Sequence, residues 1–145
     1  NLVIIRKETF DSCKELRNIK FHKDSIMKTI SKNAFHNCPI KKISIPSSVT
    51  QIGESPFSEK VQIIEIPPDS KIQSFGKEAF KNTSIRSLLI PSHVKIINLS
   101  MFADCAKLQI IEIDENSQLE QFTYWDLKDT IIMAPKFFNS IARKF

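Results

Sequence analysis

Cysteine and histidine are the residue types here that could bind a metal or form a nucleophile–base pair. The chain holds three of each, scattered along its length: Cys13, Cys38, Cys105, His22, His36 and His93. No local motif brings two of these side chains into a metal-binding or catalytic spacing. Only two glycines occur, which excludes a glycine-rich phosphate-binding loop.

Acid–base catalysis would need two carboxylates that face each other. The glutamates instead fall at solvent positions spread over the chain, among them Glu54, Glu59, Glu78 and Glu120. No pair is indicated, and none of the histidines has a carboxylate or cysteine partner predicted by the sequence. We therefore expect a protein that is not an enzyme, has no small-molecule substrate and needs no metal or other cofactor.

The 145 residues are 41% hydrophobic and 26% charged, which suits one domain or one short repeat array and excludes disorder. No run of about 18 apolar residues could span a membrane. The net charge is +5, and residues 1–45 hold ten Lys/Arg against four Asp/Glu. No aromatic residues alternate with these lysines to stack on bases, so a solvated face is favoured over nucleic-acid binding.

A repeat of about 23 residues organises the chain. Five phenylalanines lie 25, 22, 23 and 22 residues apart: Phe10, Phe35, Phe57, Phe80 and Phe102. Each has apolar residues at positions −5 and −8, and Leu119, Phe122 and Leu127 continue the pattern for a sixth time. A fixed period of this size is the signature of a solenoid.

A second half-repeat follows each phenylalanine, with aliphatic or aromatic residues in an L-x-x-L-x-L pattern. Its closing alternation predicts short strands at 17–21, 41–45, 62–66, 86–90 and 109–113. Three of these segments run directly into a proline, which lacks an N–H and marks the end of strand pairing: Pro46, Pro67 and Pro91. Gly53 and Gly76 each follow the −5 apolar residue, where we expect a turn with positive φ.

The segment from Ile40 to Phe57 resembles the BspA-like leucine-rich repeat, L-x-x-I-x-I-P-x-x-V-x-x-I-G-x-x-A-F-x-x-C, almost position for position. Ala34, Phe35 and Cys38 supply its A-F-x-x-C element, and Ala79 and Phe80 its A-F pair. The resemblance covers residues 1–127 and implies a leucine-rich-repeat solenoid, horseshoe-like, of about six coils. Short parallel β-strands would stack on one side, with turns or short helices on the other. Members of this family are often large surface proteins of bacteria and protozoa, associated with adhesion to host or matrix proteins.

The repeat also places the cysteines, each three residues after a repeat phenylalanine. Equivalent positions in adjacent coils lie roughly 5 Å apart, and Cys105 is about three coils from Cys38, so one site for all three thiols is excluded. We interpret them as small, half-buried hydrophobic residues. A disulfide between Cys13 and Cys38, in neighbouring coils, stays open.

Residues 128–145 depart from the repeat. In the run from Ile132 to Phe137, Pro135 occupies a central strand position, and a proline there argues against a further paired strand. From Pro135 onward the spacing of Phe137, Phe138, Ile141 and Phe145 predicts a short amphipathic helix. It would fold over the last coil as a cap or dock on a membrane surface or a partner.

The third and fifth residues of each L-x-x-L-x-L unit point away from the core, and they form the candidate binding face: Lys20, Lys42, Ile63, Glu65, Leu89, Ile110 and Glu112. Strands about 4.8 Å apart would bring Ile63, Leu89 and Ile110 into one apolar patch. The alternative is that β-propensity alone explains these aliphatic residues. The hypothesis is a protein partner with an apolar anchor on the patch and an acidic flank toward Lys20 and Lys42.

The function expected is therefore a non-catalytic protein–protein interaction module, a surface adhesion segment that binds host or matrix proteins outside the cell. The alternative is an intracellular scaffold repeat in the cytoplasm, built into a larger assembly such as a cytoskeletal one. Asn82 and Asn98 open Asn-x-Ser/Thr triplets that are glycan acceptors in exported eukaryotic proteins, although chance also produces such triplets. Since the chain opens with Asn1, we expect it to be a processed product or a piece of a longer protein.

Overall fold

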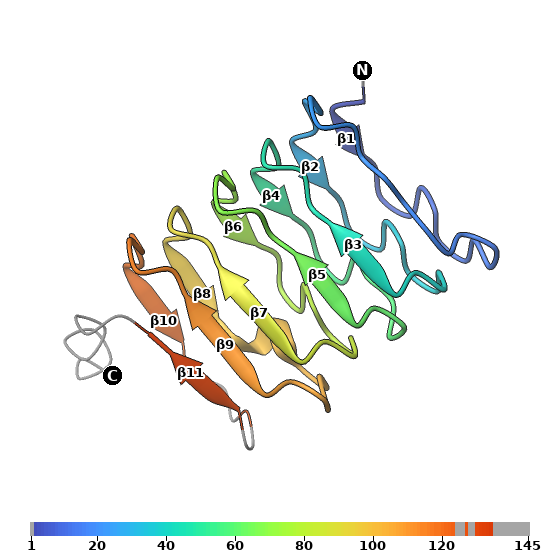
Figure 1. Cartoon of the computed structure of the whole chain (residues 1–145). Helices are drawn as coiled ribbons and strands as arrows, with labels where there is room; N and C mark the ends of the chain where they lie inside the picture. Colours follow the sequence, from blue (N-terminus) through green and yellow to red (C-terminus); the bar gives the residue numbers. More distant parts are fainter. Residues whose placement is uncertain (1, 124–126, 128–129, 135–145) are drawn as a thin grey trace.

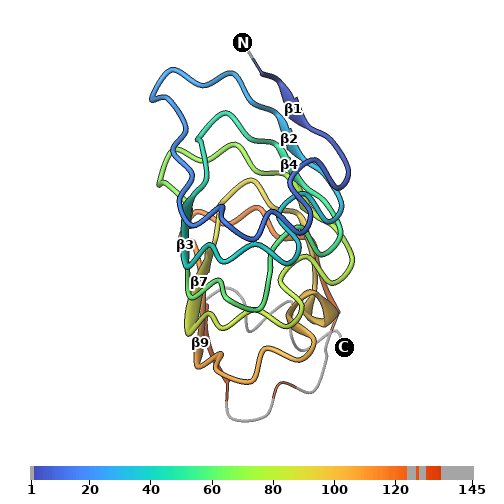
Figure 2. The ribbon, with the colours of Figure 1, turned by 90° about the vertical axis from the view of Figure 1, so that its right-hand side faces the viewer.

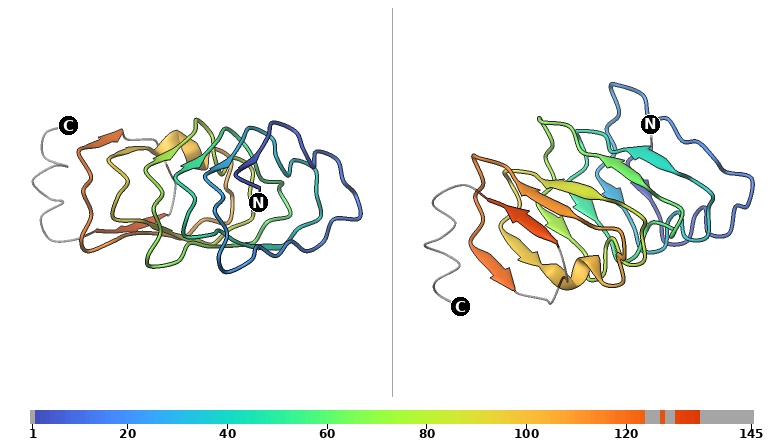
Figure 3. Two further views of the ribbon diagram at one scale, coloured as in Figure 1. Left: turned by 90° about the horizontal axis from the view of Figure 1, so that it is seen from above. Right: turned by 60° about the horizontal axis from the view of Figure 1, so that its bottom comes forward.

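The computed structural model describes residues 2–123, 127 and 130–134. It is a parallel β-solenoid of about five turns of about 23 residues with almost no helix, which confirms the predicted fold class. In each turn after the first, the chain passes through a short strand in one layer, turns, and returns through a short strand in the other (Figures 1 and 3). The one helix among the described residues is the 3-10 helix η1, Leu99–Phe102.

The layer that lies toward the viewer in Figure 1, here called the front layer, contains strands predicted from the L-x-x-L-x-L pattern and one strand that was not predicted. The predicted strands are β3 (Lys42–Ser44), β5 (Ile63–Glu65), β7 (Ser87–Ile90) and β9 (Ile110–Ile113), and the further strand is β11 (Ile131–Met133). All of the pairs described within this layer are parallel: β3 with β5, β7 with β9, and β9 with β11.

The opposite layer, the back layer, is made of strands that carry the residue five positions before each repeat phenylalanine. They are β1 (Ile4–Ile5), β2 (Thr29–Ile30), β4 (Gln51–Ile52), β6 (Ser74–Phe75), β8 (Ile96–Asn98) and β10 (Gln121–Thr123). The first four form one parallel sheet, and β8 pairs with β10. The view in Figure 2 shows the two layers enclosing the interior of the solenoid.

The core fills the space between the layers. Ile43, Leu88 and Ile111 of the front layer and Ile30 and Ile52 of the back layer are buried. The repeat phenylalanines lie at one edge of the core and stack on one another along the solenoid: Phe10 on Phe35, and Phe57 on Phe80 on Phe102, with ring centroids 5.4–6.0 Å apart. The predicted register of the repeat is therefore confirmed.

Both glycines follow a back-layer strand, but the expectation of a positive φ is wrong for both of them. The structure shows another reason for glycine at these two positions. A Cβ on Gly76 would lie 2.5 Å from the carbonyl carbon of Gly53, and a Cβ on Gly53 would lie 2.8 Å from the backbone nitrogen of Lys32. Glycine is present because the backbones of adjacent coils approach too closely for a side chain.

Positive φ values occur instead in the turns on either side of the phenylalanines. They lie two residues before the ring at Glu8, Asn33, Ser55 and Glu78, and two residues after it at Ser12, Asn37, Asn82 and Asp104. Asn and Asp tolerate this region better than most residues do.

The strand predicted at 17–21 is absent, and the expectation is wrong for this coil. Leu16, Ile19 and Phe21 still pack against the core, but they are only half-buried. Within the described residues these side chains contact a neighbouring coil on one side only, so the segment gains fewer stacking contacts than the later coils. It lies on the core without joining the hydrogen-bonded ladder.

At the other end, the expectation that no further strand pairs after residue 127 is wrong. Strand β11 pairs with β9, with Ile131 opposite Ile110 and Ile132 opposite Ile111. This register makes Ala134 equivalent to Ile113, and Pro135 lies outside the described residues. The predicted helix at 137–145 lies outside the described residues, and the domain division at residue 127 stays a prediction. No helix in the described part of the chain is long and apolar enough to cross a membrane.

Candidate binding surface on the front layer

The outer side of the front layer carries six of the seven predicted site residues, because alternate side chains of a strand point to opposite faces. The register places Lys42 beside Ile63 and Ser44 beside Glu65. In the second half of the layer, Leu89 lies beside Glu112, and Ile110 lies beside Ser87. Lys20 is exposed, but it belongs to the segment without a strand.

The apolar residues of this face are not equally exposed. The side chain of Ile63 is 49% exposed, whereas Leu89 and Ile110 are half-buried. Strand β11 adds Ile131, 62% exposed, and Met133, 54% exposed, to the same face. Neither residue was predicted from the sequence, because a proline at position 135 argued against a paired strand there.

The charged residues of the face are partly paired. The Nζ atom of Lys42 lies 2.6 Å from Oε1 of Glu65, and the hydroxyl of Ser44 donates to the same carboxylate. These contacts, that of Lys42 foremost, hold the pKa of Glu65 below its ordinary value. The pair is therefore intact at neutral pH and is lost only as the pH falls through this lowered value. Lys42 already has an acidic partner inside the chain.

The front layer is interrupted between β5 and β7. On either side of the interruption the strands are joined by a regular ladder, but β5 and β7 belong to different hydrogen-bonded sheets. The backbone N–H of Ser84 donates to the carbonyl of Val61 at 2.8 Å, and beyond this bond no strand pairing joins the described residues of β5 to those of β7. A cleft of about 260 Å³ opens there, lined by Gln62, Ile63, Ser84, Arg86 and Lys107.

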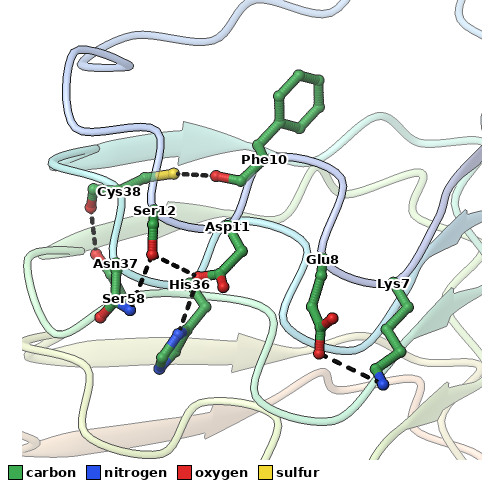
Figure 4. Close-up of polar contacts among 9 residues, drawn as sticks. All are labelled: Lys7, Glu8, Phe10, Asp11, Ser12, His36, Asn37, Cys38 and Ser58. Carbon is green, nitrogen blue, oxygen red and sulfur yellow. Dashed lines mark hydrogen bonds and ion pairs between the residues drawn. The ribbon is translucent and has the colours of Figure 1, made fainter.

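A second cluster of chemically capable side chains lies in the turns of the first two coils (Figure 4). Contrary to the expectation that no histidine has a carboxylate partner, Nδ1 of His36 lies 3.1 Å from Oδ1 of Asp11. The hydroxyl of Ser12 donates to the same Asp11 oxygen at 3.3 Å. The serine is thus bonded to the carboxylate and not to the imidazole, so this is not the arrangement of an activated nucleophile. It joins coil one to coil two.

The thiols have structural partners as well. The Sγ atom of Cys38 donates to the carbonyl of Phe10, and that of Cys105 to the carbonyl of Phe80, each at 2.9 Å. Burial raises the pKa of both thiols. Cys13 is exposed and Cys38 is buried, so the expectation of a half-buried cysteine is right only for Cys105, and all three thiols are free. Cys38 and Cys105 bridge neighbouring coils through hydrogen bonds.

Native thiol labelling should separate these residues. Cys13 is expected to react with iodoacetamide first, while Cys38 and Cys105 react at least about tenfold more slowly, because burial both blocks access and disfavours the thiolate. Peptide mass spectrometry of the chain quenched at successive times measures this order. Equal rates for all three thiols would contradict the packing described here, and labelling in denaturant provides the control for intrinsic reactivity.

A larger depression lies along the turns of the middle coils, where ion pairs join its charged residues to each other. The Nζ atom of Lys32 lies 2.7 Å from Oε1 of Glu54, and this bond lowers the pKa of Glu54 and raises that of Lys32. Glu78 pairs with Lys81 at 3.1 Å. The charges are therefore paired, Lys32 with Glu54 between neighbouring coils and Glu78 with Lys81 within one coil. Within the described ranges, no group of three His, Cys, Asp or Glu residues could hold a metal ion.

The repeat matches the family model of the BspA type leucine rich repeat region in six copies over residues 1–109. The chain belongs to the BspA-type leucine-rich repeat family. Its similarity to the crystal structure of a leucine-rich repeat protein from Bacteroides ovatus extends over 93% of this chain and 61% of that one, at 14% identity and a TM-score of 0.33. No curated protein matches the chain. Leucine-rich repeat proteins are generally protein-interaction modules and are generally not catalytic.

Proposed function

We propose that this BspA-type repeat is a non-catalytic module that binds a protein partner through the outer side of its front layer. The observation that carries the proposal is the group of exposed aliphatic side chains on that layer, Ile63, Ile131 and Met133. Solvent does not favour such side chains on an open sheet, and exposed apolar surface marks interaction sites. Half-buried Leu89 and Ile110 lie on the same face, and Ile110 is the direct neighbour of Ile131.

The back layer provides the comparison. Its central outward column is polar, with Thr29 beside Gln51 and Gln51 beside Ser74. Ile4 and Ile96 are exposed on this layer, but each lies beside a polar residue in the ladder, Thr29 and Gln121 respectively. Aliphatic neighbours in register, as Ile110 and Ile131 are, occur on the front layer.

The finer proposal is a surface adhesion segment whose partner is a host or matrix protein, as the family's typical place on the surface of bacteria or in secreted form supports. The free state of all three cysteines favours a second candidate, a scaffold repeat in a larger intracellular assembly, since disulfides are rare in reducing compartments. In the adhesion case, antibody to the folded chain labels intact cells of the source. In the scaffold case, it labels only permeabilised ones.

The binding face is tested with matched double variants on the two layers. Ile63→Asp with Ile131→Asp places two carboxylates on the front layer, and Gln51→Asp with Gln121→Asp does the same on the back layer. We expect the front variant to lose at least about tenfold in affinity for proteins retained by the wild-type chain, because a charge would be desolvated at the apolar contact. The back variant should bind like the wild type. Equal retention by both variants, with unchanged circular dichroism, would contradict the proposal.

A further inference from the structure

The interruption of the front layer between β5 and β7 lies in the middle of the proposed binding face (Figure 1). Elsewhere on this face the backbone bonds are made from strand to strand: the N–H of Gln62 donates to the carbonyl of Lys41, and that of Gln109 to the carbonyl of Arg86. Between β5 and β7 the bond runs from the N–H of Ser84 to the carbonyl of Val61, so its donor lies two residues, and its acceptor one residue, before the positions used elsewhere. Residues that follow Val61 and Ser84 line the cleft.

Two cations line this cleft, and they are not the lysines, Lys20 and Lys42, that the sequence predicted for the acidic flank of the partner. Arg86 and Lys107 are exposed, and neither side chain has an ion pair or hydrogen bond to any residue that the structure describes. Lys42, in contrast, is neutralised by Glu65. A guanidinium and an ammonium that line the same cleft attract a carboxylate or another anion, and arginine offers it a bidentate contact.

The cleft is not only cationic. Ile63 forms part of its wall with about half of its side chain exposed, and Ile110 begins the strand next to β7 on the far side. An occupant therefore meets aliphatic carbon and positive charge within one site. The volume of about 260 Å³ suits one or two side chains of a polypeptide rather than a whole small-molecule ligand.

We propose that this cleft, lined by Arg86, Lys107 and Ile63, binds an acidic, aliphatic segment of the protein partner. A carboxylate of the segment lies against Arg86 and Lys107, and a neighbouring aliphatic side chain lies on Ile63. The inference rests on the proposed function and specifies the partner's chemistry. Charge complementarity supports an acidic occupant, and the apolar wall favours a peptide over a sulfated polysaccharide, which has no aliphatic side chains to place there.

The test is an NMR titration of the isotopically labelled full chain with three defined probes. The first is a synthetic heptapeptide of alternating glutamate and leucine; the second replaces each glutamate by lysine; the third is a heparin-derived hexasaccharide. We expect saturable shifts with the first peptide, centred on the amides of residues 62–63, 84–87 and 107–110. The lysine peptide and the oligosaccharide should each bind at least about tenfold more weakly.

Two sets of variants distinguish this inference from the proposed function. Arg86→Gln with Lys107→Gln should weaken binding of the acidic peptide by about tenfold or more and flatten its salt dependence, whereas Lys71→Gln with Lys95→Gln, which removes two exposed lysines outside the cleft, should not. If the cleft variant binds the peptide unchanged while Ile63→Asp with Ile131→Asp loses it, the cleft inference fails and the binding face stands. If both variants bind unchanged, the binding face fails too. Absence of saturable peptide binding, or tighter binding of heparin, overturns the inference.

Discussion

Replacing Phe80 by alanine is expected to lower the free energy of unfolding by about 3–5 kcal/mol. The ring is fully buried. It stacks on Phe57 and Phe102 and meets Phe75 edge-on, with centroids 5.2–6.0 Å apart. Alanine would leave a cavity between three coils, because stacked backbones cannot collapse into it without breaking their ladders. Urea denaturation of wild type and variant, followed by far-UV circular dichroism, measures the difference.

Two controls give this result its meaning. Lys71→Ala, at an exposed position, should change the free energy of unfolding by no more than about 0.5 kcal/mol. Phe10→Ala should cost less than Phe80→Ala, because Phe10 is half-buried and stacks only on Phe35 among the described rings. A Phe80→Ala effect no larger than that of Lys71→Ala would mean that the register of the whole repeat is wrong.

Gly76→Ala is expected to destabilise the chain by about 1–3 kcal/mol, although alanine ordinarily stabilises by reducing the freedom of the unfolded chain. The new Cβ would lie 2.5 Å from the carbonyl carbon of Gly53 and 2.7 Å from the backbone nitrogen of Glu54. Only a backbone shift relieves this overlap, and the shift would loosen the bonds between β4 and β6. Thermal unfolding of the variant measures the effect.

The matched control is Ser31→Ala, at the equivalent position after β2. It adds no volume, since serine already carries a Cβ, so its midpoint should stay close to that of the wild type. An unchanged or raised midpoint for Gly76→Ala would show that the coils are farther apart than described here.

Much of this fold could be predicted from the sequence because the core residues of a stacked repeat recur at fixed intervals along the chain. The phenylalanines and the apolar residues before them, such as Ile30 and Ile52, are required in every coil by the same contacts. Their period therefore gave the solenoid and the front-layer strands from 41 to 113. It did not reveal the back layer, because strands of two or three residues such as Thr29–Ile30 are too short to show a period of two.

The binding face could be predicted only in outline. The alternation of residues predicts that Ile63 and Leu89 lie on the same outer side. It does not predict how exposed they are, because exposure depends on the side chains around them. The pairing of Lys42 with Glu65 follows from the register of β3 and β5. The cleft at Arg86 exists because β5 and β7 are not paired. A pattern of residue types does not show which hydrogen bonds between strands are absent.

Site-specific photo-crosslinking tests the binding face most directly. Chains carry benzoylphenylalanine at Ile63 or Ile131 on the front layer, or at Gln51 or Gln121 on the back layer, and are irradiated with an extract or matrix preparation from the native setting. The account predicts that both front positions give a discrete adduct with the same protein. Ile131→Asp should suppress the adduct of the chain labelled at Ile63, and Ile63→Asp should suppress that of the chain labelled at Ile131. The same adduct from the back positions alone, with none from the front, would contradict it.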